Sequence, residues 1–307
     1  MPCYSPLYAC LINSSTGKKF SFKRNAVGKG MSLPCGRCIG CRIEHSRQWA
    51  VRCMHESKMH DSNSFLTLTY SEDNFPKNGS VSKRDCQLFL KRLRKKFKSK
   101  KLKFFLGAEY GERFDRPHYH CIIFGSDFSE SPFNRYYSHK SNSGYPIYRS
   151  DDLENVWQKG FVFIGSVTFD SAVYVAKYCT KKVTGAAAAS HYKGKEPEFV
   201  LMSRGGKNGR GIGYSWLSKY MSDVYPSDEV IINGKQTRPP RYYDSVYKSL
   251  NPSSFDVILQ KREKFADKLE KFVYKGKEYD VSPSFNRKRL VVRKKVEEAK
   301  RNANSKN

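Results

Sequence analysis

The sequence predicts an α+β fold with an antiparallel sheet, and three observations support this class. Residues 65–70 alternate apolar and hydroxylated side chains, which is typical of a half-buried strand. Residues 82–98 carry apolar side chains at intervals of three and four, behind a serine that can cap a helix. Two further β-type segments, 102–110 and 117–124, follow with a short polar turn between them. Strands joined in this way pair antiparallel.

The next two elements complete a known arrangement. Residues 151–158 predict a short helix, and residues 160–167 predict a strand. The order strand, helix, strand, strand, helix, strand is that of a ferredoxin-like, split βαββαβ domain, with helices on one face of the sheet. A helix from Asp170 or Ser171 to about Val183 is expected to lie against this core as an extra element.

The rest of the chain is expected to form helical or irregular extensions. Residues 1–34 are predicted to be irregular, and residues 126–150, rich in Ser, Asn and Tyr, to form a long loop. Residues 256–272 predict a charged surface helix. We expect four parts along the chain: a Cys-rich N-terminal segment with a helix (1–60), the core (61–185), a basic Gly/Arg-rich extension (186–255), and a charged helix with a basic tail (256–307).

The net charge of the chain indicates which class of molecule it binds. Lys and Arg number 57 and Asp and Glu number 29, so the formal net charge is +28. Such an excess repels itself unless a polyanion is near, which favours nucleic acid over the alternative, an anionic membrane. No apolar run approaches the ~18 residues of a membrane-spanning helix. The N-terminus lacks a charged region followed by an apolar stretch, so we expect a soluble cytosolic protein without membrane association.

Two segments are suited to binding DNA. Residues 82–103 hold 11 Lys or Arg and one acidic residue, which could neutralise backbone phosphates. Aromatic side chains in the 126–150 segment could stack on unpaired bases. These residues are Tyr136, Tyr137, Tyr145 and Tyr148. The alternative is that the basic helix face is simply solvated.

Two histidines give the sharpest chemical signal. Residues two apart on a strand face the same side, so His118 and His120 point together and could share one cation. Glu109 would lie beside them in the hairpin and complete a two-His, one-carboxylate site, with Glu112 in the turn as a second candidate. Such mixed nitrogen and oxygen ligands suit Mn²⁺ or Mg²⁺. The alternative is a pair of structural histidines bonded to backbone or water.

A later helix carries two tyrosines one turn apart. Tyr174, Lys177 and Tyr178 fall on one helical stripe, opposite a stripe of small apolar residues. A phenol attacks a phosphodiester poorly, but a cation that polarises the phosphate makes the attack feasible and leaves a phosphotyrosine. The alternative is an amphipathic helix that simply turns Tyr and Lys to solvent.

Cysteines cluster before the first predicted helix. Cys35, Cys38 and Cys41 have the spacing of zinc ligands, but a tetrahedral site needs a fourth. The candidates are Cys53, His45, His55, Cys3 and Cys10. Our predicted structural zinc set is Cys35, Cys38, Cys41 and Cys53. The alternative is a Cys-rich turn with thiols packed beneath Trp49.

At these residues the chain resembles a known superfamily. The His-hydrophobic-His strand and the Tyr-x-x-x-Tyr helix look like those of HUH endonucleases, the rolling-circle replication initiators. The segment from Tyr174 to Tyr178 is similar to the paired-tyrosine motif of initiators from small single-stranded DNA bacteriophages. Residues 33–42 and 46–50, with the basic C-terminal end, resemble gokushovirus-type microvirus initiators.

The resemblance implies a function. It implies an HUH core in which a divalent metal, Mg²⁺ or Mn²⁺, supports nicking of single-stranded DNA at a replication origin, with a 5′-phosphotyrosine intermediate and later rejoining. By position it assigns His118, His120 and Glu109 to the metal, and Tyr174, Tyr178 and Lys177 to catalysis. No Walker A sequence occurs, so a host helicase and polymerase are expected as partners, in the cytoplasm of the bacterial host.

Two other functions remain open. The first is a Tyr-HUH transposase or plasmid initiator, which the paired tyrosines and the microvirus-like N-terminal segment disfavour. The second is a non-catalytic, zinc-containing nucleic-acid-binding protein in which the histidines are structural. Nicking that depends on the tyrosines would distinguish the enzyme from the binding protein.

Overall fold

The computed structural model forms two compact units, residues 1–45 with 251–307 and residues 46–250. We call them the first and the second unit. The structure describes residues 3–14, 17–23, 29–98, 100–111, 114–141, 143–181, 183, 187–205, 210–266, 270–274, 277–281, 291–292, 294–296 and 298–299. Among these residues, no helix has the length and apolar character needed to cross a membrane.

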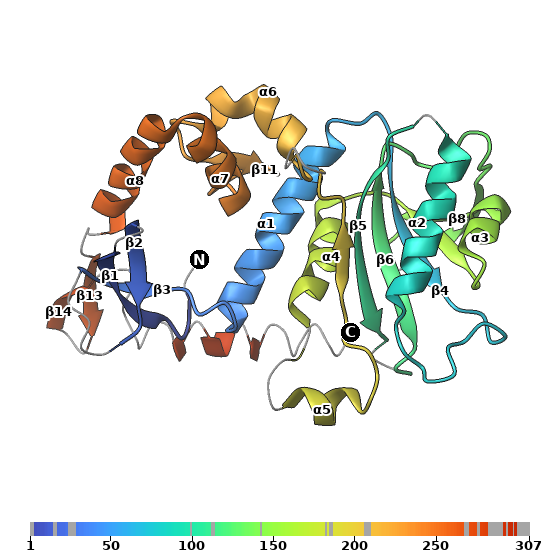
Figure 1. Cartoon of the computed structure of the whole chain (residues 1–307), viewed down its shortest axis with the longest axis horizontal. Coiled ribbons are helices and arrows are strands. Elements are labelled where there is room, and N and C mark those ends of the chain that lie inside the picture. The colour runs from blue at the N-terminus through green and yellow to red at the C-terminus, as the bar shows by residue number, and fades with distance from the viewer. Residues whose placement is uncertain are drawn as a thin grey trace. The chain divides into compact units, whose positions relative to one another are not determined.

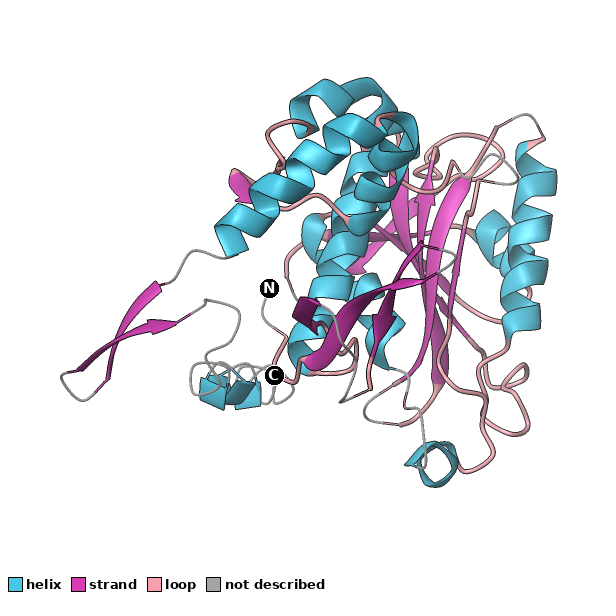
Figure 2. Ribbon diagram, turned by 60° about the vertical axis from the view of Figure 1, so that its left-hand side comes forward, coloured by secondary structure: helices cyan, strands magenta, loops and turns pink. Residues whose placement is uncertain are grey.

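A seven-stranded sheet is the centre of the second unit (Figure 2). Its strand order is β10-β5-β6-β4-β9-β8-β7, and each neighbouring pair is antiparallel. The predicted α+β class with an antiparallel sheet is therefore confirmed. The strands are β4 (Asn63–Thr69), β5 (Lys103–Tyr110), β6 (Pro117–Phe124), β7 (Tyr136–Lys140), β8 (Pro146–Arg149), β9 (Val162–Gly165) and β10 (Val200–Met202).

Helices cover both faces of this sheet. α2 (Lys83–Phe97) and α3 (Asp151–Trp157) lie on one side of β4, β5 and β6, and α4 (Phe169–Lys181) lies on the other (Figure 1). The last part of α1 (Ile39–Ser57) joins α4, since Ala50 and Cys53 pack in the same buried cluster as Ala172 and Val175. The expectation of helices on one face holds for α2 and α3, the two helices of the predicted split unit, and the extra helix expected from Asp170 or Ser171 lies against the other face as α4. The physical reason is that β5 and β6 are apolar on both faces and need cover on each.

The alternation along β6 fixes which side chains face which layer. Tyr119, Cys121 and Ile123 belong to the cluster beneath α2 and α3. Ile122 and Phe124 belong to the cluster beneath α4. The even-numbered positions of β6, which include both histidines, therefore face the α4 layer.

Sequence patterns located most of these elements. Ser82 caps α2 as predicted, since its side chain accepts a hydrogen bond from the Asp85 N–H at 3.1 Å. The predicted loop at residues 126–150 is wrong, because it contains the β7–β8 hairpin, which joins the sheet through Tyr148 opposite Ile164. β7, at the edge of the sheet, is largely exposed, and β8 is half-buried throughout, so neither shows the apolar alternation that marks a strand.

Smaller elements complete the second unit. They are α5 (Ala187–Tyr192), α6 (Tyr214–Val224), α7 (Arg241–Leu250) and the hairpin of β11 (Val230–Ile232) with β12 (Lys235–Thr237). α6 and α7 bury an aromatic stack in which the His55 ring lies 3.5 Å from the Trp216 ring. His55, one of the candidates for the fourth zinc ligand, is thus buried in an aromatic stack that is part of the packing.

The first unit contains a three-stranded sheet, in the order β2-β1-β3. Its strands are β1 (Leu7–Ser14), β2 (Gly17–Ser21) and β3 (Lys29–Leu33), so the prediction that residues 1–34 are irregular is wrong. The unit also contains α8 (Pro252–Ala266) and the hairpin β13 (Glu270–Tyr274) with β14 (Lys277–Val281). The helix predicted at 256–272 thus ends earlier, and most of the basic tail lies outside the described residues.

Candidate active site

The β5–β6 hairpin brings one carboxylate and two imidazoles together. Glu109 lies directly opposite His118 in the ladder, and Gly107 lies opposite His120. Glu109 Oε1 is 2.8 Å from His118 Nε2 and 3.2 Å from His120 Nε2. Glu109 and His120 are almost fully buried, at 3% and 6% exposure. One carboxylate oxygen therefore faces two ring nitrogens in a poorly solvated place.

Neighbouring groups orient both rings. His118 Nδ1 donates to the Arg116 carbonyl oxygen at 3.1 Å, which leaves Nε2 aimed at Glu109. His120 Nδ1 lies 3.1 Å from Thr67 Oγ1, and Thr67 is the residue paired with His120 across β4 and β6. Partners of this kind fix ring orientation and tautomer in metal sites. Thr67 was not among the residues predicted from the sequence, although the hydroxylated alternation of residues 65–70 hinted at it.

Helix α4 brings Tyr174 to the same group. Its Oη donates to Glu109 Oε1 at 3.2 Å, and its ring lies 4.9 Å from the His120 ring between centroids. The small side chains Ala172 and Ala176 are buried in the cluster between α4 and the sheet. Small residues there let the helix approach the strands closely, and this approach brings the phenol within reach of the carboxylate.

The start of α4 is set by a reciprocal cap. The Thr168 N–H donates to Ser171 Oγ at 2.8 Å, and the Ser171 N–H donates to Thr168 Oγ1 at 3.1 Å. These bonds satisfy N–H groups that have no partner within the helix, so they fix where its first turn begins. The position of Tyr174 along the helix follows from that starting point.

The structure describes the remaining predicted site residues only in part. Lys177 lies on α4 one turn beyond Tyr174, and its side chain is exposed. Tyr178 is also on α4, but its side chain lies outside the described part of the structure. Glu112, the second carboxylate candidate, lies outside the described residues.

The donor set fits a divalent cation. The ligand atoms of Glu109, His118 and His120 all lie within 4.8 Å of one another. Two imidazole nitrogens and one carboxylate oxygen match Mn²⁺ well and Mg²⁺ less well, with open positions left for water or a phosphate oxygen.

A second candidate metal group lies in the first unit. Cys3, Cys35, Cys38 and Cys41 bring their sulfurs within 4.8 Å of one another. The predicted fourth ligand, Cys53, is not in this group and is a buried residue of the cluster beneath α4. The reason is helix geometry: Cys41 and Cys53 lie on the same helix α1, and twelve residues at 1.5 Å each separate them by about 18 Å.

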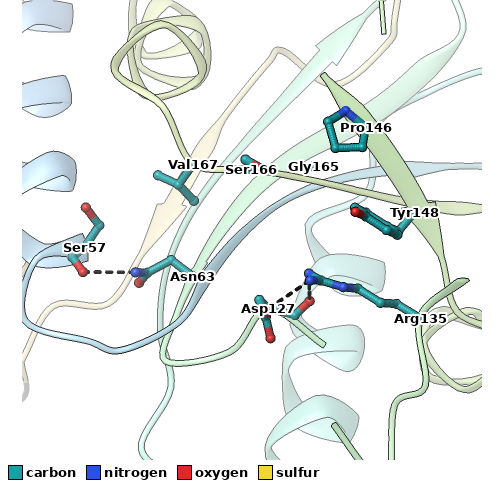
Figure 3. Close-up of a pocket in the computed structure, with 9 residues that line it drawn as sticks. All are labelled: Ser57, Asn63, Asp127, Arg135, Pro146, Tyr148, Gly165, Ser166 and Val167. Carbon is teal, nitrogen blue, oxygen red and sulfur yellow. Dashed lines mark hydrogen bonds and ion pairs between the residues drawn. The ribbon is translucent and has the colours of Figure 1, made fainter. Parts of the chain in front are cut away.

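An open pocket lies away from the metal-binding group (Figure 3). Asn63, at one end of β4, lines it, whereas Thr69, at the other end, pairs with His118. Asn63 and Thr69 are six positions apart along β4, which corresponds to about 20 Å. Arg135 and Tyr148 also line the pocket, and the guanidinium lies 4.6 Å from the ring centroid. The pocket is therefore no part of the candidate active site.

Comparisons with known proteins show which proteins the chain is similar to. The family model "Replication-associated protein ORF2/G2P" matches residues 63–183, which contain the hairpin and α4. Replication-associated protein VP4 of Bdellovibrio phage phiMH2K is 33% identical over 266 residues, which cover 83% of this chain and 80% of that protein. Replication-associated protein ORF2 of Spiroplasma virus 4 is 32% identical over 297 residues, which cover 87% of each.

A third relative is matched over a smaller share of its length. Replication-associated protein ORF4 of Chlamydia phage 1 is 30% identical over 247 residues, which cover 78% of this chain and 58% of that protein. No solved structure matches the chain. Because two relatives above 30% identity are matched over most of both chains, the chain belongs to the family of phage replication-associated proteins and is a gokushovirus-type replication initiator.

Proposed function

We propose that the protein is a site-specific, single-stranded DNA endonuclease and ligase that initiates rolling-circle replication of a phage genome. The observation that carries the proposal is the contact of Tyr174 Oη with Glu109 Oε1 at 3.2 Å, beside two imidazoles on the same face of the sheet. A nucleophile and a metal-binding group are thereby next to one another, as transesterification of a phosphodiester requires.

Each residue has a role in the proposed reaction. Glu109, His118 and His120 would hold Mg²⁺ or Mn²⁺, which would supply polarisation of the scissile phosphate. The Tyr174 oxygen attacks phosphorus, the bond from phosphorus to the 3′-oxygen breaks, and the phenol proton passes through solvent to the departing oxygen. The products are a 5′-phosphotyrosine and a free 3′-hydroxyl. The phosphodiester bond energy is kept, so the reverse step rejoins ends.

The residues that follow Tyr174 extend this chemistry. Lys177 lies three residues further on the helix, so its ammonium group can help to neutralise the phosphate. Tyr178, four residues on, is the proposed second nucleophile, which cleaves a new site while the first tyrosine is still loaded. This role rests on its spacing from Tyr174 in the sequence.

The strand order supports an HUH core. The four strands of the predicted split βαββαβ unit are adjacent in the order β5-β6-β4-β9, with α2 and α3 in the two helical intervals. Both helices contribute to one buried cluster against the sheet. The histidines are on β6, a central strand, where an HUH pair belongs.

Single-stranded DNA at the origin is the proposed substrate. Tyr136, Tyr137 and Tyr145 are about half exposed on the β7–β8 hairpin, where bases could stack on them. The basic face of α2 provides charge for the backbone. A host helicase and polymerase would supply unwinding and synthesis, in the cytoplasm of the bacterial host.

The test is covalent trapping on an origin oligonucleotide. With Mn²⁺ or Mg²⁺, the full-length protein is expected to form an adduct that survives denaturation, with the 5′ side of the cut on a tyrosine identified by mass spectrometry. Tyr174→Phe with Tyr178→Phe should abolish the adduct, whereas Tyr137→Phe, at an exposed tyrosine of the β7–β8 hairpin, should retain it. Adduct formation by the double variant would contradict the proposal.

A matched set of histidine variants tests the metal role. His118→Ala with His120→Ala should remove Mn²⁺-dependent cleavage, while His139→Ala, a histidine of strand β7, should leave it intact. Unchanged cleavage by the double histidine variant would show that the cation acts elsewhere.

A further inference from the structure

Sheet pairing in the first unit brings two distant cysteines together. Leu7 pairs with Leu33 where β1 begins and β3 ends. Cys3 precedes this paired position and Cys35 follows it, so both leave the sheet at the same end. The Cys35 N–H donates to Cys3 Sγ at 3.2 Å, which holds the two segments in contact.

The next turn adds two further thiols. The Cys38 N–H donates to Cys35 Sγ at 3.3 Å, which closes the turn. Gly36 has φ +73° and open space within 4 Å of where a β-carbon would lie, so backbone conformation is the reason for a glycine there. Helix α1 begins at Ile39, so Cys38 precedes its first residue and Cys41 lies in its first turn.

The sulfur spacing matches a shared tetrahedral ion. Cys3 Sγ and Cys38 Sγ are 3.8 Å apart, and these four cysteines form no disulfide. A tetrahedron with zinc–sulfur bonds of about 2.3 Å has sulfurs about 3.8 Å apart. A disulfide would require about 2.05 Å. The Cys3 and Cys38 sulfurs thus have the separation of ligands around one metal, and all four sulfurs lie within 4.8 Å of one another.

Backbone N–H groups donate to three of the four sulfurs. Besides the two N–H donors already named, the Tyr4 N–H donates to Cys38 Sγ at 3.2 Å. The first turn of α1 has no acidic residue, and its N-terminal end is the positive end of the helix dipole. Hydrogen bonds to ligating sulfurs are the usual outer contacts of such a site.

We propose that Cys3, Cys35, Cys38 and Cys41 form a tetrathiolate zinc site that fastens the N-terminal segment to the start of α1. Four soft sulfur ligands select zinc over Mg²⁺ or Mn²⁺, and four protein ligands leave no open position for a substrate. The site is therefore structural, and it is separate in composition and chemistry from the Glu109 and histidine group. Because Cys3 precedes β1 and the other three ligands follow β3, metal binding stabilises the pairing of these two strands.

Metal analysis of the full-length protein tests this inference. In a His118→Ala and His120→Ala background, which removes the other metal group, the purified chain is expected to hold one zinc per molecule. Cys3→Ser should lose most of this zinc to a competing chelator. Cys10→Ala, which alters a buried cysteine of β1 outside the group, should retain it. No bound zinc, or equal retention by the Cys3→Ser and Cys10→Ala variants, would overturn the site.

Cobalt spectroscopy identifies the ligands independently of stability. Co²⁺ substitution should give the ligand-field and sulfur charge-transfer bands of a tetrathiolate ion. Cys3→His, which keeps four ligands, should retain the metal and shift these bands toward a three-sulfur, one-nitrogen set. An iron–sulfur absorption in the protein as purified, or a cobalt spectrum that Cys3→His leaves unchanged, would refute the proposal.

Discussion

Replacing Thr67 with valine tests how the protein would set its affinity for the proposed catalytic cation. Thr67 Oγ1 lies 3.1 Å from His120 Nδ1. A ring that binds a cation through Nε2 must carry its proton on Nδ1, and the threonine oxygen is placed to accept it. Valine keeps the β-branched shape that suits a strand but offers no acceptor. The ring then loses the group that favours its metal-binding tautomer.

The expected loss is moderate and specific. Removal of such an outer contact lowers metal affinity by about 10–100-fold, or about 1.4–2.8 kcal/mol. The Mn²⁺ concentration for half-maximal nicking should rise by that factor, while the rate at saturating Mn²⁺ stays close to that of the wild type. Calorimetric titration of Mn²⁺ into the DNA-free protein should give the same loss of affinity without turnover.

Thr69→Val provides a matched control on the same strand. Thr69 pairs with His118, but its Oγ1 donates to the Phe161 carbonyl oxygen at 3.4 Å, and His118 is oriented by the Arg116 carbonyl instead. The same chemical change at this position should leave Mn²⁺ affinity unaltered. If both valine variants show the same Mn²⁺ dependence, the reasoning about His120 is refuted.

Three further outcomes follow from burial, backbone geometry and exposure. Burial lowers the pKa of His55 from 6.5 to about 3. The unfolded chain therefore takes up a proton that the folded chain does not. The free energy of unfolding should fall as pH drops below 6.5, by about 2.7 kcal/mol over two pH units. His55→Gln should remove this loss when unfolding is measured by urea titration. Gly160→Ala should destabilise the fold by about 3 kcal/mol or more, because φ is +146° and a β-carbon would lie 2.3 Å from the Ser71 nitrogen. Tyr137→Ala should weaken single-stranded DNA binding by about 1–3 kcal/mol if a base stacks on this ring, as measured by fluorescence anisotropy.

Each of these outcomes has a clear contrary result. A pH dependence of unfolding that His55→Gln leaves unchanged would remove that histidine as its source. Gly144 also has positive φ, at +82°, but has no atom within 4 Å of an added β-carbon, so Gly144→Ala should be milder than Gly160→Ala. Equal destabilisation would show that the close contact is not the cause. Equal effects of Tyr137→Ala on single-stranded and duplex DNA would argue against stacking on unpaired bases.

The candidate metal-binding group was predictable because its geometry is local. Glu109 and His118 are nine residues apart and face one another across a single hairpin, so strand periodicity and a short turn are enough to predict their meeting. Thr67 was not predictable in the same way. It reaches His120 only because β4 inserts next to β6, and neighbour order in a sheet depends on packing of the whole domain.

The cysteine group could not be predicted in full from the sequence. Cys3 joins Cys35 through the pairing of β1 with β3. β3 (KGMSL) has Lys, Gly and Ser among its five residues, so its sequence does not mark a strand, whereas β1 (LYACLINS) is largely apolar and was overlooked. The prediction of Cys53 as the fourth ligand conflicts with the helix that was itself predicted there. A residue twelve positions along a helix from Cys41 is about 18 Å away. Helix rise was therefore sufficient to exclude Cys53, but identifying Cys3 required the fold.

The register of β6 connects the site to the opposite face of the sheet. From Cys121 onward the strand is apolar on both faces, so hydrophobic pattern alone does not choose its register. Its polar end does. The Tyr119 hydroxyl lies 2.8 Å from Tyr70 Oη and accepts from the Ser82 N–H at 2.7 Å, within the cluster beneath α2 and α3. A slip of one residue would bury the imidazoles there and break both bonds. The hydrogen bonds of a phenol on one face thus hold the two imidazoles against Glu109 on the other.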